Sequence, residues 1–279
     1  MRFHSKSSLL IYAILVMLLI VSSAIVMTAP ILWLLSTSFK TGETVFATPP
    51  KLLPDNPTLA NYEYVLQSAD VPLYLGNSMV VAVLSVFLNL LLSALVAYPL
   101  ARMQFRGKKV LFLSILATMV VPFQSIMLPI FLICKHLGIV NTPIGVVLPT
   151  AITALGVYLL RLAFMAIPYE LEEAARIDGC SDFRIWYQIM LPLIKPSLAT
   201  LAIITFTAAW SDFLWPVIVL QDPERFTLPV GIQYFMSMMT SNWQHISAVS
   251  IIATLPTVIL FLLLQHYFYA GTLSGAVKG

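Results

Sequence analysis

The sequence predicts an all-α integral membrane protein with six transmembrane helices, on the strength of three observations. Of its 279 residues, 59% are hydrophobic and only 10% are charged, whereas about 25% of the residues in a soluble domain are charged. The charged residues separate apolar runs that are each long enough for a membrane helix of about 20 residues. Lysine and arginine gather in alternate connecting segments, as they do in membrane proteins of defined orientation. The bilayer therefore serves as solvent for much of the apolar surface.

Six apolar runs supply the predicted spans of a single transmembrane domain covering residues 1–279. Pro30 is expected to kink the first span, and Pro122 and Pro129 make the third an irregular helix. Arg161 stands at the very end of the fourth span, and Asp212 is the one acidic residue inside any of them. The approximate boundaries are 11–37, 75–100, 110–134, 142–162, 197–220 and 246–269.

The first span has an alternative interpretation as a cleaved signal peptide. Arg2 and Lys6 precede the apolar run, and small residues lie near Ser22–Ala24. However, the charge-free run continues from Ser7 to Phe39, which exceeds the 7–15-residue core of a signal peptide. We therefore predict a retained first transmembrane helix.

The basic residues set the predicted orientation, with both termini in the cytoplasm. If the N-terminus lies inside, eleven lysines and arginines fall in inside segments and four in outside segments. The run ARMQFRGKK at residues 101–109 fixes this orientation locally. A nucleic-acid-binding patch would also be basic, but the flanking spans favour a topology signal, and we expect no nucleic-acid partner.

Two outside segments have features of their own. The Pro-rich stretch between the first two spans is expected to be ordered, with Thr58 capping a short helix that runs through Val65. The segment between the last two spans is rich in aromatic residues and methionine. These residues suit either the membrane interface or an adaptable binding surface.

A charged segment between the fourth and fifth spans, residues 168–196, is predicted to be a cytoplasmic helix–turn–helix. Pro168 can start its first helix, whose dipole favours the acidic residues in the first turns. Glu172 and Arg176 are expected to form a stabilising i, i+4 pair. Gly179 fits the left-handed position that ends a helix.

The second helix of this segment is largely apolar, and the first carries small residues. Ser181 can cap the second helix. Ala174 and Ala175 have minimal side chains, so another surface can approach them closely. A solvated loop needs none of these features, so the segment is interpreted as a docking element for a cytoplasmic partner. The apolar residues of the second helix are Phe183, Ile185, Trp186, Ile189 and Leu191.

This segment resembles the EAA signature of membrane subunits of binding-protein-dependent ATP-binding-cassette (ABC) importers. The Pro-rich outside stretch, the sequence NSMVVAVLSV opening the second span and the tail LSGAVKG extend the resemblance over nearly the whole chain. Together they are similar to the carbohydrate-uptake branch, and to the maltose-type permease subunit that ends in such a tail. The signature positions are Glu173, Ala174, Ala175, Gly179, Ile189, Leu191 and Pro192.

The resemblance implies a type I importer permease fold and an ATPase-coupling role for these signature residues. Glu173 is then expected to pair with a basic residue in a cleft of the ATPase subunit, and Gly179 to let the two short helices turn. Closure of the ATPase dimer on ATP would move the segment and drive alternating access. The cytoplasmic tail, residues 270–279, would reach the ATPase dimer, with Gly275 and Lys278 as contacts.

The resemblance also implies the partners and location. We expect a second homologous permease subunit, two ATPase subunits as a homodimer or heterodimer, and an external solute-binding protein, in the inner membrane of a prokaryote. ATP and Mg²⁺ would be held by the ATPase subunits. The expected solute is a sugar, an oligosaccharide or a polyol-type compound.

The chain itself is expected to be no enzyme and to bind no metal or cofactor. The stretch RGKKV at residues 106–110 lacks the glycine spacing of a phosphate-binding loop. The four histidines are scattered, with no metal-ligand spacing or catalytic arrangement. Cys134 and Cys180 form no CxxC pair and are interpreted as ordinary thiols.

The stretch TAAWSDFLWP supplies a candidate substrate path or gate in Trp210, Ser211, Asp212 and Trp215. Aromatic rings and carboxylates bind sugars, and a buried acid should face the bundle interior or a cavity. Not all four side chains can point into one pore, because Trp210 is displaced by about 100° from Ser211 on a helix. The alternative is a structural role near the outer interface.

Two other function classes remain open on the sequence. An ion-coupled secondary transporter would show intramembrane charges at repeat-related positions, whereas Asp212 stands alone. A channel-like membrane component would leave the charged segment with no ATPase to engage.

Overall fold

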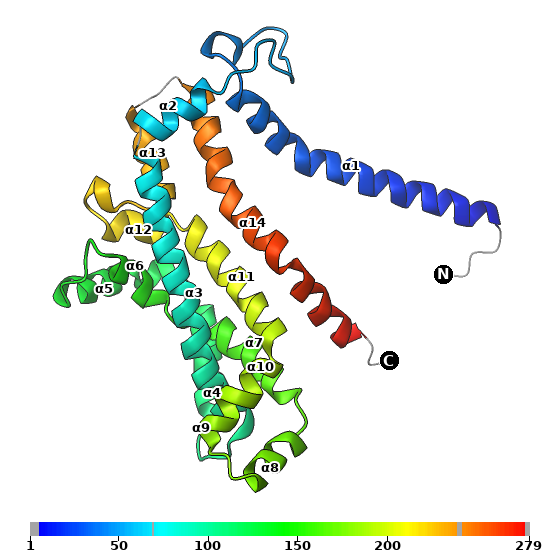
Figure 1. Ribbon diagram of the computed structural model, residues 1–279, viewed down its shortest axis with the longest axis vertical. Helices are drawn as coiled ribbons and strands as arrows, with labels where there is room; N and C mark the ends of the chain where they lie inside the picture. Colours follow the sequence, from blue (N-terminus) through cyan, green and yellow to red (C-terminus); the bar gives the residue numbers. More distant parts are fainter. Residues whose placement is uncertain (1–5, 69, 239–241, 277–279) are drawn as a thin grey trace. The chain divides into compact units, whose positions relative to one another are not determined.

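The computed structural model describes residues 6–68, 70–238 and 242–276, and every regular element in these ranges is a helix, so the all-α prediction is confirmed. Three helices are long and apolar enough to cross a membrane, and up to six spans result if each bent helix pair counts as one. The three are α1 (Lys6–Ser38), α3 (Val71–Arg102) and α14 (Trp243–Ala276) (Figure 1).

The remaining apolar runs form bent or interrupted helices. The third run bends by 102° between α4 and α5, and the fourth bends by 53° before α7. Pro122 lies in extended backbone just before α5, whereas Pro129 is accommodated inside that helix. Their elements are α4 (Lys108–Ala117), η2 (Thr118–Val120), α5 (Phe123–His136), α6 (Pro143–Val147), η3 (Leu148–Thr150) and α7 (Ala154–Met165).

The fifth run is interrupted at Asp212. Helix α11 (Lys195–Ser211) ends there because Asp212 adopts an extended conformation, with φ −69° and ψ 122°. A short helix, α12 (Leu214–Val219), follows. The Asp212 carboxylate accepts the N–H of Trp215 at 3.4 Å, which is the type of contact that favours a helix start.

The charged segment forms a series of short helices between α7 and α11. These are α8 (Glu170–Ile177), α9 (Asp182–Ile185), the π-helix η4 (Trp186–Met190) and α10 (Leu191–Leu193). Figure 1 shows α8 and α9 near the end of α3 at which that helix stops.

The contacts divide the chain into two compact units. In the unit made by residues 1–69 and 235–254, Asn61 donates hydrogen bonds to the carbonyls of Ser38 and Lys40, both at 2.8 Å. Thr58 accepts the N–H of Ala60 at 3.1 Å where α2 begins. Its short helices are η1 (Gly42–Thr44) and α2 (Ala60–Ser68). Two more elements, η5 (Pro223–Arg225) and α13 (Leu228–Met238), precede α14.

In the unit made by residues 70–234 and 255–279, α3 packs along α7 and α11. Small residues on α3, such as Ala94 and Ala97, are buried there and let the helix backbones approach closely. The same core takes in side chains of the charged segment, among them Ala175, Ile185 and Met190. The charged segment is thus anchored to the ends of the membrane helices.

Candidate functional site

The turn between α8 and α9 has the geometry that the sequence predicts. Gly179 has a φ of +79°. The N–H of Cys180 bonds the carbonyl of Ala175, and the N–H of Gly179 bonds that of Arg176, both at 3.0 Å; this double closure is a Schellman motif. Ser181 then caps α9 by accepting the N–H of Arg184. The two local predictions, the left-handed glycine and the serine cap, are confirmed.

The predicted pair between Glu172 and Arg176 is wrong. Glu172 is buried and pairs with Arg102 at 2.8 Å, and Arg176 pairs with Asp182 at 3.0 Å. Burial decides the difference, because a buried carboxylate needs a buried cation to compensate its lost hydration. Arg102 at the end of α3 is such a cation, whereas Arg176 is exposed and reaches across the glycine turn instead.

The two alanines of the EAA pattern face different ways. Ala175 lies in the core of this chain, whereas Ala174 is exposed. The expectation that both lie on one free surface is therefore wrong, since α8 uses one alanine for its own attachment. We use the name free face for five exposed residues of α8, α9 and η4: Glu173, Ala174, Ile177, Phe183 and Tyr187.

Apolar exposure distinguishes the free face from a solvated loop. Ile177 is 86% exposed, Phe183 68% and Tyr187 61%. Ile189 and Leu191 instead pack against the core, and Pro192 is exposed in α10. Ala175, Ile189 and Leu191 therefore attach the segment to the core, whereas Glu173 and Ala174 are exposed.

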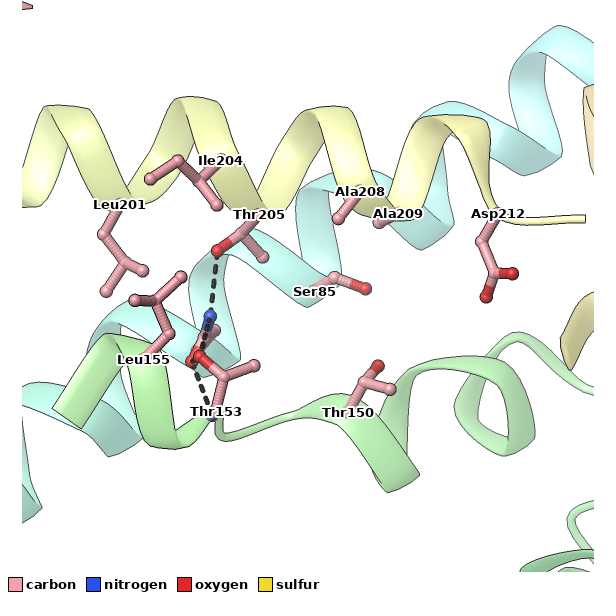
Figure 2. Close-up of a pocket in the computed structure, with 11 residues that line it drawn as sticks. Ser85, Thr150, Thr153, Leu155, Leu201, Ile204, Thr205, Ala208, Ala209 and Asp212 are labelled. Carbon is pink, nitrogen blue, oxygen red and sulfur yellow. Dashed lines mark hydrogen bonds between the residues drawn. The ribbon is translucent and has the colours of Figure 1, made fainter. Parts of the chain in front are cut away.

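A second feature is a cavity of about 400 Å³ between α3, α7 and α11. Figure 2 shows that one end is polar, with Ser85, Thr150 and Asp212, and the other apolar, with Leu155 and Ile204. The cavity lies where two predicted spans are interrupted, after Ser211 and between Thr150 and Ala154. Interrupted membrane helices commonly form solute sites, because their free backbone groups need polar neighbours.

A buried amide, Asn89 of α3, joins the helices around the cavity. Its Nδ2 donates to Thr205 of α11 at 2.8 Å and to Thr153, which caps α7, at 3.2 Å. Its Oδ1 accepts from Ser93 at 2.9 Å and from the N–H of Thr153 at 3.0 Å. We call these four residues the Asn89 junction.

The structure brings only one of the four predicted path residues to this cavity. Asp212 lines it, whereas Trp210 is buried in a stack on Phe206. Trp215 is 1% exposed and donates to the carbonyl of Gly145 at 3.1 Å. Ser211 bonds the carbonyl of its own helix. The two tryptophans are thus packing residues.

Sequence reasoning missed the Asn89 junction, although the sequence holds a signal for it. Ser78, Ser85, Asn89 and Ser93 recur at spacings of seven, four and four within the apolar second span. Such spacing places them on one helix face, which marks a polar stripe directed into a bundle. The hydroxyls of Thr153 and Thr205 come from other helices and could be connected to it only in three dimensions.

The two predicted tail contacts, Gly275 and Lys278, lie at the C-terminal end of the chain. Gly275 lies in the last turn of α14, and Lys278 lies outside the described residues. Within the described ranges, no group of three or more histidine, cysteine, aspartate or glutamate side chains could hold a metal ion.

Comparison with known families identifies the chain. A family model described as "Binding-protein-dependent transport system inner membrane component" matches residues 89–273. The chain belongs to this family. The match covers the Asn89 junction, the charged segment and all of the cavity lining except Ser85, and it confirms the family that the EAA pattern indicated.

Curated relatives of this chain include the arabinooligosaccharides transport system permease protein AraQ of Halalkalibacterium halodurans. It is 38% identical, over 90% of this chain and 91% of its own length. The lactose transport system permease protein LacG of Rhizobium radiobacter is 33% identical, over 75% of this chain and 76% of its own length.

Solved structures with a similar fold also come from ABC transporters. A crystal structure of a bacterial ABC transporter involved in the import of the acidic polysaccharide alginate contains a chain with a TM-score of 0.85 and 26% identity. The likeness covers 96% of the present chain and all of the alginate transporter's chain. A second, at 16% identity with a TM-score of 0.68 over 94% of both chains, shows the same fold. It is a bacterial alginate ABC transporter in complex with an alginate pentasaccharide-bound periplasmic protein.

Proposed function

We propose that this chain is the permease subunit of an ATP-driven importer that carries a sugar or oligosaccharide into the cytoplasm of a prokaryote. It pairs with a second permease subunit in the cytoplasmic membrane and with two ATPase subunits that hold ATP and Mg²⁺. An external solute-binding protein delivers the solute. The names of the relatives, on arabino-oligosaccharides and lactose, support this class of solute.

One observation carries the proposal: the free face projects apolar side chains from a segment whose other side is fixed in the core. Glu173 and Ala174 are exposed on the same helix as Ile177, which is 86% exposed. A soluble surface gains nothing from exposing such a patch, whereas a docking surface does. ATP-driven closure of the ATPase dimer can shift the permease between its two states only if the dimer binds one of them better.

The cavity fits a polar solute with hydroxyl groups. Ser85, Thr150 and Asp212 supply a donor-and-acceptor surface at one end, and hydroxyls satisfy such groups when water leaves. A cavity of about 400 Å³ lies within the usual range for small-molecule sites. We propose that it forms this subunit's part of the solute path.

The test is to purify the tagged chain with its ATPase partners and solute-binding protein, and to reconstitute the complex in liposomes. ATP hydrolysis is measured across a panel of arabino-oligosaccharides, lactose, alginate oligosaccharides and polyols. We expect one class of saccharide to stimulate hydrolysis and to accumulate inside. Failure of any ATPase subunit to co-purify, or of every saccharide to stimulate, would contradict the proposal.

The role of Asp212 is tested by Asp212→Asn, with Ser211→Ala as the matched control. Uptake should fall in the first variant because the cavity loses its carboxylate, and it should remain normal in the second because Ser211 bonds its own helix. Co-purification of the ATPase checks that assembly is intact in both. Normal uptake by Asp212→Asn would remove this residue from the path.

A further inference from the structure

A buried ion pair connects the charged segment to the longest helix of the core. The Nε of Arg102, the last residue of α3, lies 2.8 Å from Oε1 of Glu172 in α8. Their side chains are 1% and 4% exposed. Among ion pairs of the described residues, this one alone joins a membrane helix to the segment.

The Arg102 guanidinium also contacts the connecting segment between α7 and α8. Its Nη2 donates to the carbonyl of Ile167, and its plane lies over the ring of Tyr169 with 4.2 Å between Cζ and the ring centroid. Arg102 thus contacts both the residues that lead into α8 and the first turn of that helix. Contacts of this kind fix direction as well as distance, because a planar guanidinium has rigid donor geometry.

Helix α3 carries both Arg102 of this pair and the cavity-lining residue Asn89. It runs for 32 residues with Pro99 inside it. Helices α7 and α11 adjoin the charged segment along the chain and also reach the cavity, but the buried ion pair joins α8 to α3. Asn89 lies 13 residues before Arg102 on the same helix, which is roughly 20 Å at 1.5 Å per residue. A displacement of α8 that is passed to Arg102 is therefore delivered to the Asn89 junction.

We propose that the Arg102–Glu172 pair transmits the ATP-driven displacement of α8 to α3 and so to the Asn89 junction beside the cavity. This inference rests on the proposed function. Arg102 and Glu172 act as positioning residues in this proposal, because neither is proposed to touch solute or nucleotide. Glu172 differs in role from its neighbour Glu173, which belongs to the free face. The exposed side of α8 contacts the ATPase subunit, and the buried side transmits the displacement through Glu172.

The test uses the reconstituted complex and measures solute transported per ATP hydrolysed. In Glu172→Gln the charge is lost with little change in shape, and we expect this ratio to fall roughly 5- to 150-fold, the usual range for coupling between sites. ATP hydrolysis and co-purification of the ATPase should persist. Glu170→Gln, an exposed acid on the same helix, is the matched control and should keep the wild-type ratio.

A merely structural pair would behave differently. If uptake and hydrolysis fall in proportion, leaving the ratio unchanged, the pair only stabilises the fold and the inference is overturned. Should Glu172→Gln fail to assemble, Glu172→Asp keeps the charge but shortens its reach, and a reduced ratio in that variant supports the inference while a normal ratio overturns it. An inactive wild-type complex would instead contradict the proposed function itself.

A double-mutant cycle checks the proposed route through α3. Effects of distant, independent substitutions are additive, whereas connected sites are not. The transport ratio is compared for Glu172→Gln, Asn89→Ser and the two combined. We expect the combined loss to be smaller than the product of the single losses, because either change already disconnects the cavity. Independent, multiplicative losses would count against transmission through α3.

Discussion

Gly156 lies where the oxygen atoms of the Asn89 junction converge on α7. A Cβ at this position would lie 2.6 Å from the Ser93 hydroxyl, 2.9 Å from Thr153 Oγ1 and 3.1 Å from Asn89 Oδ1. None of these atoms can move away without giving up a hydrogen bond in a buried network. At the scale of single residues, the close contact of α3 with α7 thus depends on a missing side chain.

Gly156→Ala should therefore destabilise the protein by about 1–3 kcal/mol, as expected for overpacking. The measurement is the thermal unfolding midpoint in detergent. Gly76→Ala is the control, because a Cβ there has no neighbouring atom within 4 Å and alanine favours a helix interior by about 1 kcal/mol. Equal midpoints for the two variants would show that the junction tolerates a methyl group.

At the scale of elements, the α8–α9 turn fixes the position of the free-face residues of α8 relative to those of α9 and η4. The Schellman closure and the exposed pair of Arg176 with Asp182 both span Gly179. The exposed pair contributes little, since surface ion pairs are worth about 0–1 kcal/mol. The glycine matters more, because an ordinary residue in its left-handed conformation costs about 1–2 kcal/mol.

Ile177→Ala and Phe183→Ala should each weaken co-purification of the ATPase subunit. Ile177 is 86% exposed, so its truncation should leave the unfolding midpoint unchanged. Phe183 is 68% exposed, but its ring centroid also lies 5.4 Å from that of Trp186, so Phe183→Ala should lower the midpoint slightly as well. Leu193→Ala, 50% exposed on α10 outside the free face, is the control. A lower midpoint with normal co-purification would mean that the two side chains pack within the chain.

Local features of these elements were predictable from the sequence, and long-range ones were not. Gly179 and Ser181 were placed correctly because caps depend on neighbouring residues. Glu172 was assigned to Arg176, four residues away, because the sequence does not show that the end of α3 lies closer. Asp212 was recognised as an intramembrane acid, but the break in its helix and its hydroxyl neighbours arise from tertiary packing.

At the scale of the whole molecule, much of the apolar surface needs covering from outside the chain. The most apolar stretch of α1 has no buried residue, which suits contact with lipid or another subunit. Buried polar groups among the described residues include those of the Asn89 junction, the Arg102–Glu172 pair and the cluster around Asn61. Specific polar contacts thus supplement the apolar core inside this chain.

The stability of the fold should depend on pH through Glu172. Burial raises the pKa of this carboxyl above its ordinary value, and the Arg102 guanidinium offsets part of the rise. The native state therefore holds a proton at pH values where the unfolded chain has released it. By linkage, stability rises as pH falls through the raised pKa towards about 4.5.

The unfolding midpoint in detergent, measured between pH 7.5 and 5, should show this trend relative to Glu172→Gln. The unfolding midpoint of the wild type minus that of Glu172→Gln should increase as the pH is lowered. A difference that moves the other way would mean that the Arg102 charge outweighs burial.

The position of Arg102 has a consequence for how the protein is made. Glu172 follows it by 70 residues, so at the usual rates of translation Arg102 leaves the ribosome roughly 4–14 s before its counter-ion exists. During insertion it belongs to the basic run ARMQFRGKK, the kind of run that favours the cytoplasmic side of a membrane. Only after α8 has been synthesised can Glu172 pair with it and bury it. The same guanidinium is therefore first a part of a basic topology signal and then a part of a buried ion pair.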